Sequence, residues 1–108
     1  MDAFEILDLI DEQEVRDERY YEFFVAKTLS LGLYQLSAGD DDPQQPHTED
    51  EVYYIVSGRG QIKVGEEDQT VQPGSIIFVE AAVEHRFHTI EEDLTILVVF
   101  APPRGSQA

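Results

Sequence analysis

Short apolar runs separated by turn residues recur along residues 29–100, and this pattern constrains the fold more than any other feature. In several runs apolar and polar residues alternate, and clusters of glycine, proline or acidic residues separate one run from the next. A period of two residues indicates β-strands, because successive strand side chains point to opposite faces of a sheet. Many short strands without a long helical period are typical of β-barrels and sandwiches. The sequence therefore predicts an all-β domain.

Individual strands follow from the same pattern. The alternating run Leu29–Ser37 predicts one strand, and Ser75–Val79 predicts a short one that is apolar on both faces and therefore covered on both sides. The last two strands are expected over His85–Ile90 and Leu94–Phe100, with the acidic residues Glu91–Asp93 turning the chain between them.

The N-terminal 28 residues have a different character. The apolar spacing around Ile6 and Ile10 fits either a helical turn or an edge strand, and both remain open. The segment Asp11–Arg19 is nearly all charged, which predicts a solvated turn or a short helix. An aromatic group follows, formed by Tyr20, Tyr21, Phe23 and Phe24. We expect it to cap the core or join a subunit interface, with packing favoured over ligand binding.

Three consecutive aspartates, Asp40–Asp42, lie in a loop rich in glycine and proline. The alternating ligand spacing and the terminal glutamate of a calcium-binding loop are both missing. The composition therefore predicts a solvated loop.

Length, charge and cysteine content exclude several classes of protein. A chain of 108 residues can bury one core, so we expect one domain. The absence of cysteine excludes disulfide and thiolate chemistry and favours a reducing compartment, the cytoplasm. No apolar run approaches the length of a membrane span, and the N-terminus lacks a signal pattern. A formal charge of −16 argues against nucleic acid or anionic lipid as a partner.

One stretch carries candidate metal ligands. The run Val52–Val56 reads as a strand that ends in glycine. If the strand alternation extends back along the chain, Gln45, His47, Glu49 and Glu51 all lie on one face. An imidazole and a carboxylate at the mouth of a strand suit a borderline divalent metal.

This stretch resembles the first motif of the cupins, a family of small β-barrels. The motif reads glycine, a gap, His-x-His, three or four residues, Glu, six residues and Gly. Glu51 and Gly58 have the six-residue gap, and His47 takes the position of the second histidine. Gln45 stands where the first histidine is found in the family, which is a departure from the motif.

The run from Pro73 to His85 resembles the second cupin motif, which leads from proline-glycine to a histidine. Here Glu80 and Ala82 replace the proline and glycine usual in the family, and Thr89 stands where asparagine is frequent. The resemblance covers residues 29–103, and it implies a double-stranded β-helix, or jelly-roll, over that range. Residues 1–28 would be an N-terminal extension that packs on the barrel or on a partner subunit, and residues 104–108 a tail.

A homodimer is a further expectation. The strands at Val52–Val56 and Leu94–Phe100 are apolar on both faces, so one face can fill the barrel while the other needs a cover. The N-terminal segment or a second copy of the chain would supply that cover. Dimers are also usual in the family.

The resemblance implies a metal site built from His47, Glu51 and His85. Two imidazoles and one carboxylate leave coordination positions open for water or substrate, and such sets serve iron, manganese, nickel, zinc or cobalt. Gln45 would supply an amide oxygen or leave its position to water. The alternative is that His47 and Glu51 are hydrogen-bonded residues at a strand entrance and that His85 is a core histidine.

Other polar and aromatic residues are expected near this site or at the surface. Tyr53 and Phe87 share the expected faces of Glu51 and His85, so we expect them to line the pocket for a small-molecule ligand. Glu49 is a spare ligand candidate, and His88 is expected at the surface or an interface. Basic residues such as Arg59 and Arg86 are expected mainly in salt bridges, given the acidity of the chain.

Several functions remain open at this stage. A redox-active metal implies a dioxygenase-like enzyme, whereas zinc, manganese or nickel implies Lewis-acid chemistry of the isomerase, lyase or decarboxylase type. A barrel that captures a metabolite or a metal without catalysis is the alternative from a different class. The same fold carries many chemistries, so the fold does not choose among these functions.

Overall fold

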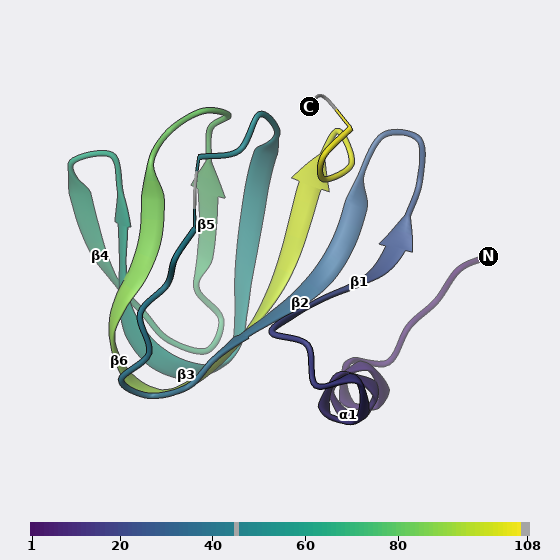
Figure 1. Cartoon of the computed structure of the whole chain (residues 1–108), viewed down its shortest axis with the longest axis horizontal. Coiled ribbons are helices and arrows are strands. Elements are labelled where there is room, and N and C mark those ends of the chain that lie inside the picture. The colour runs from purple at the N-terminus through teal and green to yellow at the C-terminus, as the bar shows by residue number, and fades with distance from the viewer. Residues whose placement is uncertain (45, 107–108) are drawn as a thin grey trace.

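Six antiparallel strands form one bent sheet in the computed structural model of the chain, which describes residues 1–44 and 46–106 (Figure 1). Within the described residues, one helix precedes the strands. The elements are α1 (Ile6–Arg16), β1 (Tyr20–Val25), β2 (Ser30–Leu36), β3 (Asp50–Val64), β4 (Glu67–Val71), β5 (Ile76–Val79) and β6 (His85–Ala101). The prediction of an all-β domain is therefore confirmed.

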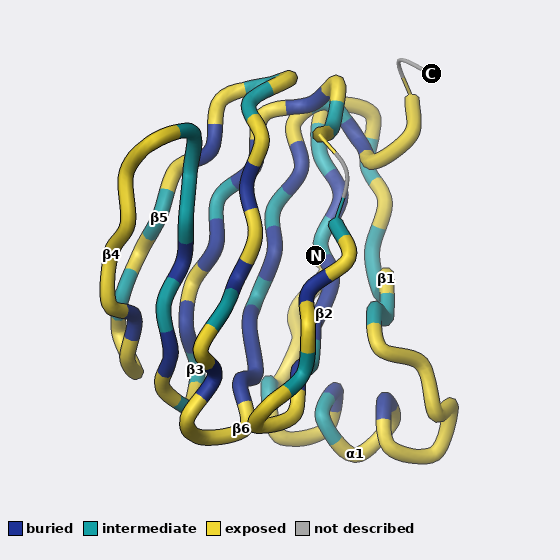
Figure 2. Tube along the Cα trace, turned by 60° about the vertical axis from the view of Figure 1, so that its left-hand side comes forward, coloured by how far each residue is buried: buried dark blue, intermediate teal, exposed yellow. Residues whose placement is uncertain are grey.

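The long strands β3 and β6 are the centre of the sheet. The strand order is β1-β2-β6-β3-β4, and β5 pairs with the first part of β3, where β4 is absent. Hydrogen bonds do not join the two edges of the sheet within the described residues, so the sheet curls around its interior without closing. Buried and exposed positions alternate along β3 and β6, as Figure 2 shows, because one face lines that interior.

A bend in β3 and β6 replaces the turn expected at Glu91–Asp93 and the strand end expected at Gly58. The register between the strands shifts three times between Ile55 and Gln61, and Arg59 pairs with Glu92. Gly58 lies at this bend with φ of 95°, and a Cβ there would collide with the backbone carbonyl of Asp93. The expected turn at Glu91–Asp93 is thus wrong. These acidic residues are exposed on the strand at the outside of the bend, so their polarity reflects solvent contact and not a chain reversal.

The helical alternative for the N-terminal segment is the one observed. Helix α1 ends at Arg16 and is capped by Asp17, which has left-handed backbone angles. Gln13 is buried, and its amide donates hydrogen bonds to the carbonyls of Glu18, Arg19 and Leu33 at 3.0–3.1 Å. These bonds fix the helix against β2. The aromatic segment that follows forms β1, the edge strand beside β2.

The interior of the curled sheet is a single apolar core. Its largest fully buried apolar side chains are Tyr53, Phe87, Leu36, Ile55, Ile62, Leu94 and Ile96. Within the described part of the chain, no helix has the length and apolarity needed to cross a membrane.

The outer face of the sheet beside β5 is apolar and exposed, contrary to the expected cover on both sides of that strand. Ile76 is 71% exposed and Phe78 is 60% exposed, because β5 lies beside β3 with its outer face toward solvent. Tyr54, the neighbour of Ile76 on β3, is exposed as well. We call these three side chains the outer apolar patch.

Candidate metal centre

Three side chains from separate parts of the chain converge inside the sheet. Glu51 lies at the start of β3, His47 in the loop that precedes it, and His85 at the first position of β6. Oε1 of Glu51 is 3.0 Å from Nε2 of His85 and 3.6 Å from Nε2 of His47. One ligand atom from each residue lies within 4.8 Å of the other two. The three residues can therefore hold one metal ion.

The carboxylate of Glu51 is the most unusual group of the cluster. The residue is 1% exposed, and neither carboxylate oxygen accepts a hydrogen bond from the described residues. The 3.0 Å approach of His85 is an ion pair only when the imidazole is protonated. A buried carboxylate without partners is costly unless a cation neutralises it. The residues present therefore fit a metal cation.

His85 is oriented by the backbone. Its Nδ1 lies 2.9 Å from the carbonyl oxygen of Val83, which can only accept a hydrogen bond. Nδ1 is consequently the protonated nitrogen of the neutral ring, and the lone pair of Nε2 faces the cluster, as in typical metal-binding histidines. Burial lowers the pKa of His85, but Glu51 and the Val83 carbonyl outweigh burial, so the pKa is raised above its usual 6.5.

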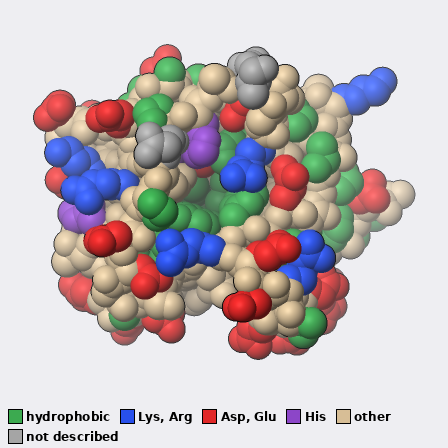
Figure 3. All heavy atoms as spheres, in the orientation of Figure 1, with side chains coloured by type: hydrophobic (Ala, Val, Ile, Leu, Met, Phe, Trp, Pro, Cys, Tyr) green, Lys and Arg blue, Asp and Glu red, His purple; other side chains and the backbone are tan. Residues whose placement is uncertain are grey.

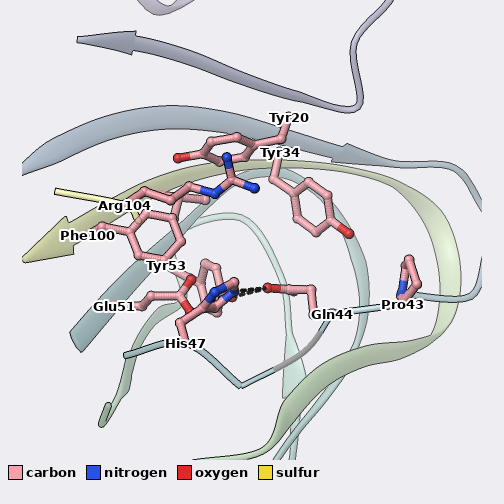
Figure 4. A pocket seen from close by; sticks show the side chains of 10 residues that line it. Tyr20, Tyr34, Pro43, Gln44, His47, Glu51, Tyr53, Phe100 and Arg104 are labelled. Carbon is pink, nitrogen blue, oxygen red and sulfur yellow. Dashed lines mark hydrogen bonds and ion pairs between the residues drawn. The ribbon is translucent and has the colours of Figure 1, made fainter. Parts of the chain in front are cut away.

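Gln44, which the sequence analysis did not single out, also faces the cluster. Its side-chain Oε1 lies 3.2 Å from Nε2 of His85, 3.4 Å from Nε2 of His47 and 3.0 Å from the hydroxyl of Tyr53. Figure 4 shows this amide pointing toward His47. The predicted ligand Gln45 lies outside the described residues. Alignment to the cupin motif places the first-histidine position at Gln45. The only sequence signal for Gln44 is that it is the adjacent glutamine.

Asp42 orients the Gln44 amide. Asp42 is buried, so the expectation of a solvated aspartate loop is wrong at this position. Its carboxylate accepts hydrogen bonds from Nε2 of Gln44 at 2.7 Å, the hydroxyl of Tyr34 at 2.6 Å and the backbone NH of Phe87 at 2.9 Å. Since the Gln44 NH₂ group is engaged by Asp42, its carbonyl oxygen turns toward the histidines. These donors come from other elements, and the composition of the loop gave no sign of them.

Tyr53 and Phe87 occupy different places beside the cluster. Tyr53 is buried on β3, and its hydroxyl donates to Oε1 of Gln44. Burial and then the charge of Glu51 hold the pKa of Tyr53 well above its ordinary value, so the hydroxyl stays protonated. Phe87 is fully buried behind Tyr53, with a ring-centroid separation of 5.1 Å.

Other candidates lie away from the cluster. Glu49 is buried, and its carboxylate accepts a hydrogen bond from the hydroxyl of Thr48. His88 contacts Asp68 through Nε2 at 2.5 Å on the outside of the sheet. The strand alternation holds from Asp50 on, but residues 46–49 lie outside any strand, so the alternation does not extend back to Glu49.

The cluster opens into a cavity of about 310 Å³. Figure 3 shows this face of the molecule hollowed, with hydrophobic side chains inside the hollow and a histidine and basic side chains around its rim. The lining residues are Tyr20, Tyr34, Pro43, Gln44, His47, Glu51, Tyr53, Val98, Phe100 and Arg104. A small, mostly apolar cavity with a few convergent polar groups is typical of small-molecule sites.

Comparison with known proteins gives consistent matches. Residues 32–100 match the family model described as "Cupin domain". The uncharacterized protein SCO3923 of Streptomyces coelicolor is 48% identical over 105 residues, covering 97% of this chain and 100% of that protein.

Solved structures show the same architecture. The TT1209 protein of Thermus thermophilus superposes with a TM-score of 0.77 at 24% identity, covering 95% of this chain and 99% of that one. An RmlC-like cupin of Methanocaldococcus jannaschii with a double-stranded β-helix fold has a TM-score of 0.69 at 18% identity, covering 81% of this chain and 84% of that one. The predicted jelly-roll fold is thereby confirmed.

Proposed function

The chain belongs to the cupin family, and from this premise we propose that it is a metal-dependent cupin enzyme acting on a small organic molecule. One divalent first-row metal ion would be bound by His47, Glu51 and His85. The observation that carries the proposal is the buried Glu51 carboxylate, which has no hydrogen-bond donor within the described residues and faces two imidazole nitrogens. A structural carboxylate in a core is normally hydrogen-bonded, and this one is not.

The surroundings of the three ligands support the proposal. The Val83 carbonyl sets the ring of His85, and Asp42 sets the Gln44 amide, so two donor atoms are held in place by residues behind them. Such supporting hydrogen bonds are general at metal sites because they fix ligand orientation. The Gln44 carbonyl oxygen is a fourth, weaker donor in place of the first motif histidine.

The donor set suits iron, manganese, nickel or zinc and leaves room for a substrate beside the ligands. When bound, such an ion supplies Lewis acidity, and a redox-active ion also supplies electron transfer to oxygen. The side chains of the protein would shape the cavity around the ion. The apolar side chains of Val98 and Phe100 exclude water from the cavity and orient the substrate, and His47 forms part of the wall beside Phe100 at a ring-centroid distance of 5.1 Å.

Two reaction classes follow from the identity of the metal. Iron would make oxygenase chemistry the first reaction to assay. Zinc, manganese or nickel would direct attention to isomerase or lyase chemistry, and one observation favours this second candidate. The hydroxyl of Tyr53 stays protonated beside the cluster, so it can donate a hydrogen bond that polarises a substrate oxygen next to a Lewis-acidic ion. A barrel that binds metal or metabolite without turnover is the alternative.

The test is the metal content of the untagged protein, measured by elemental mass spectrometry as purified and after reconstitution. We expect a stoichiometric divalent ion in the wild type and its loss in His85→Ala. His88→Ala is the matched control, because it removes a histidine on the same strand that contacts Asp68 outside the cluster. Circular dichroism verifies that both variants are folded.

The outcomes separate the alternatives. Equal metal content in His85→Ala and His88→Ala would refute the ligand assignment. No metal in the reconstituted wild type would leave a metal-free ligand-binding barrel. Bound iron with oxygen uptake would support the oxygenase, and bound zinc, manganese or nickel without oxygen uptake would support the second candidate.

A further inference from the structure

Among the described residues, Arg104 is the one arginine in the wall of the cavity, and it lies across from the candidate metal centre. In Figure 4 Arg104, Tyr20 and Phe100 form one side, and His47, Glu51 and Gln44 form the other. The ring of Phe100 links the two sides, because its centroid lies 5.1 Å from that of His47 and 6.2 Å from that of Tyr20. A molecule in the cavity therefore meets the histidine cluster at one end and a guanidinium at the other.

The backbone of Arg104 is held by the fold, and its exposed side chain packs on Tyr20. Its backbone NH donates to the hydroxyl of the buried Ser30 at 3.0 Å, which fastens the C-terminal segment to β2. Its guanidinium carbon lies 4.7 Å from the centroid of the Tyr20 ring, a cation–π arrangement. Tyr20 in turn lies flat against Gly32, where any side chain would collide with the phenol. Three residues thus position the guanidinium at the cavity.

The arginines differ in whether they pair with a carboxylate and whether they line the cavity. Arg16, Arg19 and Arg59 each pair with a carboxylate, at 3.3, 3.4 and 3.7 Å respectively. Arg86 and Arg104 make no ion pair within the described residues, although the chain carries 23 aspartates and glutamates, and of these two only Arg104 lines the cavity. In so acidic a protein, an arginine held in a cavity without a carboxylate has its hydrogen-bond donors available for an anion from outside.

We propose that Arg104 is the anchor for a carboxylate of the ligand, so that the cavity takes a short-chain organic acid whose other end reaches the metal centre. The planar guanidinium matches a carboxylate through two parallel hydrogen bonds. A phosphate group, with more charge and more acceptor oxygens, would need further cations, and the described part of the cavity wall holds no Lys or Arg side chain besides Arg104. The volume of about 310 Å³ limits the acid to a small molecule.

This inference deepens the proposed function and rests on it for the position of the second end of the ligand. The test uses malonate, succinate and glutarate as probes, with neutral glutaramide and inorganic phosphate as comparisons. Binding to the full chain is measured by isothermal titration calorimetry, in metal-loaded and in chelator-stripped protein. Arg104→Met removes the charge but keeps an apolar stem over Tyr20. Arg86→Met is the matched control, since Arg86 is exposed on β6 outside this cavity.

We expect at least one diacid to bind the wild type and Arg86→Met equally. In Arg104→Met its affinity should fall about tenfold or more, as the loss of a charge-assisted hydrogen-bond pair predicts. Equal affinity in Arg104→Met, equal binding of glutaramide, preference for phosphate, or no binding of any diacid at millimolar concentration would each overturn the anchor.

Metal content separates this inference from the proposed function. If Arg104→Met and the wild type retain the same metal while no diacid binds, the anchor is wrong and the metal centre stands. If the wild type binds no metal but stripped protein still binds a diacid through Arg104, the anchor stands and the metal centre is wrong.

Discussion

The side-chain oxygen of Gln44 lies 3.2 Å from Nε2 of His85, although the two residues are separated by 41 positions in the chain. The contact joins the loop before β3 to the start of β6 across the open end of the sheet. It depends on Asp42, which binds the NH₂ group of Gln44 and thereby turns its carbonyl oxygen inward. The loop that looked like a solvent-exposed acidic turn is therefore part of the support of the candidate metal centre.

Replacement of Asp42 tests that support. In Asp42→Asn the side chain keeps one acceptor oxygen but loses the negative charge that holds Gln44, Tyr34 and the NH of Phe87. We expect metal affinity to fall about tenfold or more, as is general when a supporting residue behind a ligand is changed. Isothermal titration with the metal measures the change. Asp41→Asn, at an exposed neighbouring position, is the control and should bind metal as the wild type does.

A pH series tests the coupling between His85 and Glu51. The pKa of His85 is raised in the folded protein, so in metal-free protein the protonated ring stabilises the fold. That contribution is fully present below the usual value of 6.5 and is lost as pH rises through the higher folded-state pKa. A metal ion competes with this proton, so its binding strengthens over the same range.

The expected readout is the difference in Tm between metal-loaded and metal-free protein. This difference should grow as pH rises from below 6.5 through the folded-state pKa of His85. In metal-free protein, Glu51→Gln should weaken the pH dependence of Tm that His85 contributes, because the carboxylate that raises the pKa of His85 is gone. A difference that is independent of pH in the wild type would contradict the coupling.

The parts of the site that the sequence could predict are those set by local strand geometry. Glu51 and Tyr53 lie on β3, where alternation places them on the inner face, and His85 lies on the inner face of β6. Their positions can be predicted because the two-residue period of a strand determines which side chains face the interior. Gly58 was expected to end a strand, but β3 continues through it, and glycine is needed there because a Cβ would collide with the backbone carbonyl of Asp93.

The remaining parts depend on contacts between distant segments. The roles of Asp42 and Gln44 arise from hydrogen bonds to β6 and to each other. Both residues lie in an irregular loop, where the position of a residue in the sequence does not predict the direction of its side chain. Arg104 reaches the cavity because Ser30 holds the C-terminal segment, a contact over 74 positions. The turn expected at Glu91–Asp93 is wrong because exposed strand residues and turn residues can both be rich in acidic side chains.

Two tyrosine hydroxyls offer a matched test of buried hydrogen bonding. The hydroxyl of Tyr20 is buried without a partner in the described residues, whereas that of Tyr34 donates to Asp42 at 2.6 Å. Tyr20→Phe should therefore leave the free energy of unfolding unchanged or raise it by about 1 kcal/mol. Tyr34→Phe should lower it by about 1–3 kcal/mol, because Asp42 loses a donor. Urea unfolding monitored by circular dichroism measures both, and a larger loss in Tyr20→Phe would contradict the assignment.

The outer apolar patch leads to a prediction about assembly. Tyr54, Ile76 and Phe78 form neighbouring exposed positions on β3 and β5 and carry no charge. Two chains with a formal charge of −16 each repel one another, so an uncharged face is where two copies can approach most closely. We propose that the patch is covered by a second copy of the chain, in a symmetric dimer.

Light scattering on the full chain measures its mass in solution, and we expect that of two chains. Phe78→Asp places a charge in the middle of the patch and should give the mass of one chain with the fold intact by circular dichroism. Val15→Asp is the control, because Val15 is an exposed apolar residue on α1, away from β3 and β5. It should leave the mass unchanged. A wild-type mass of one chain, or a Phe78→Asp variant that stays dimeric, would show that the patch is not the contact surface.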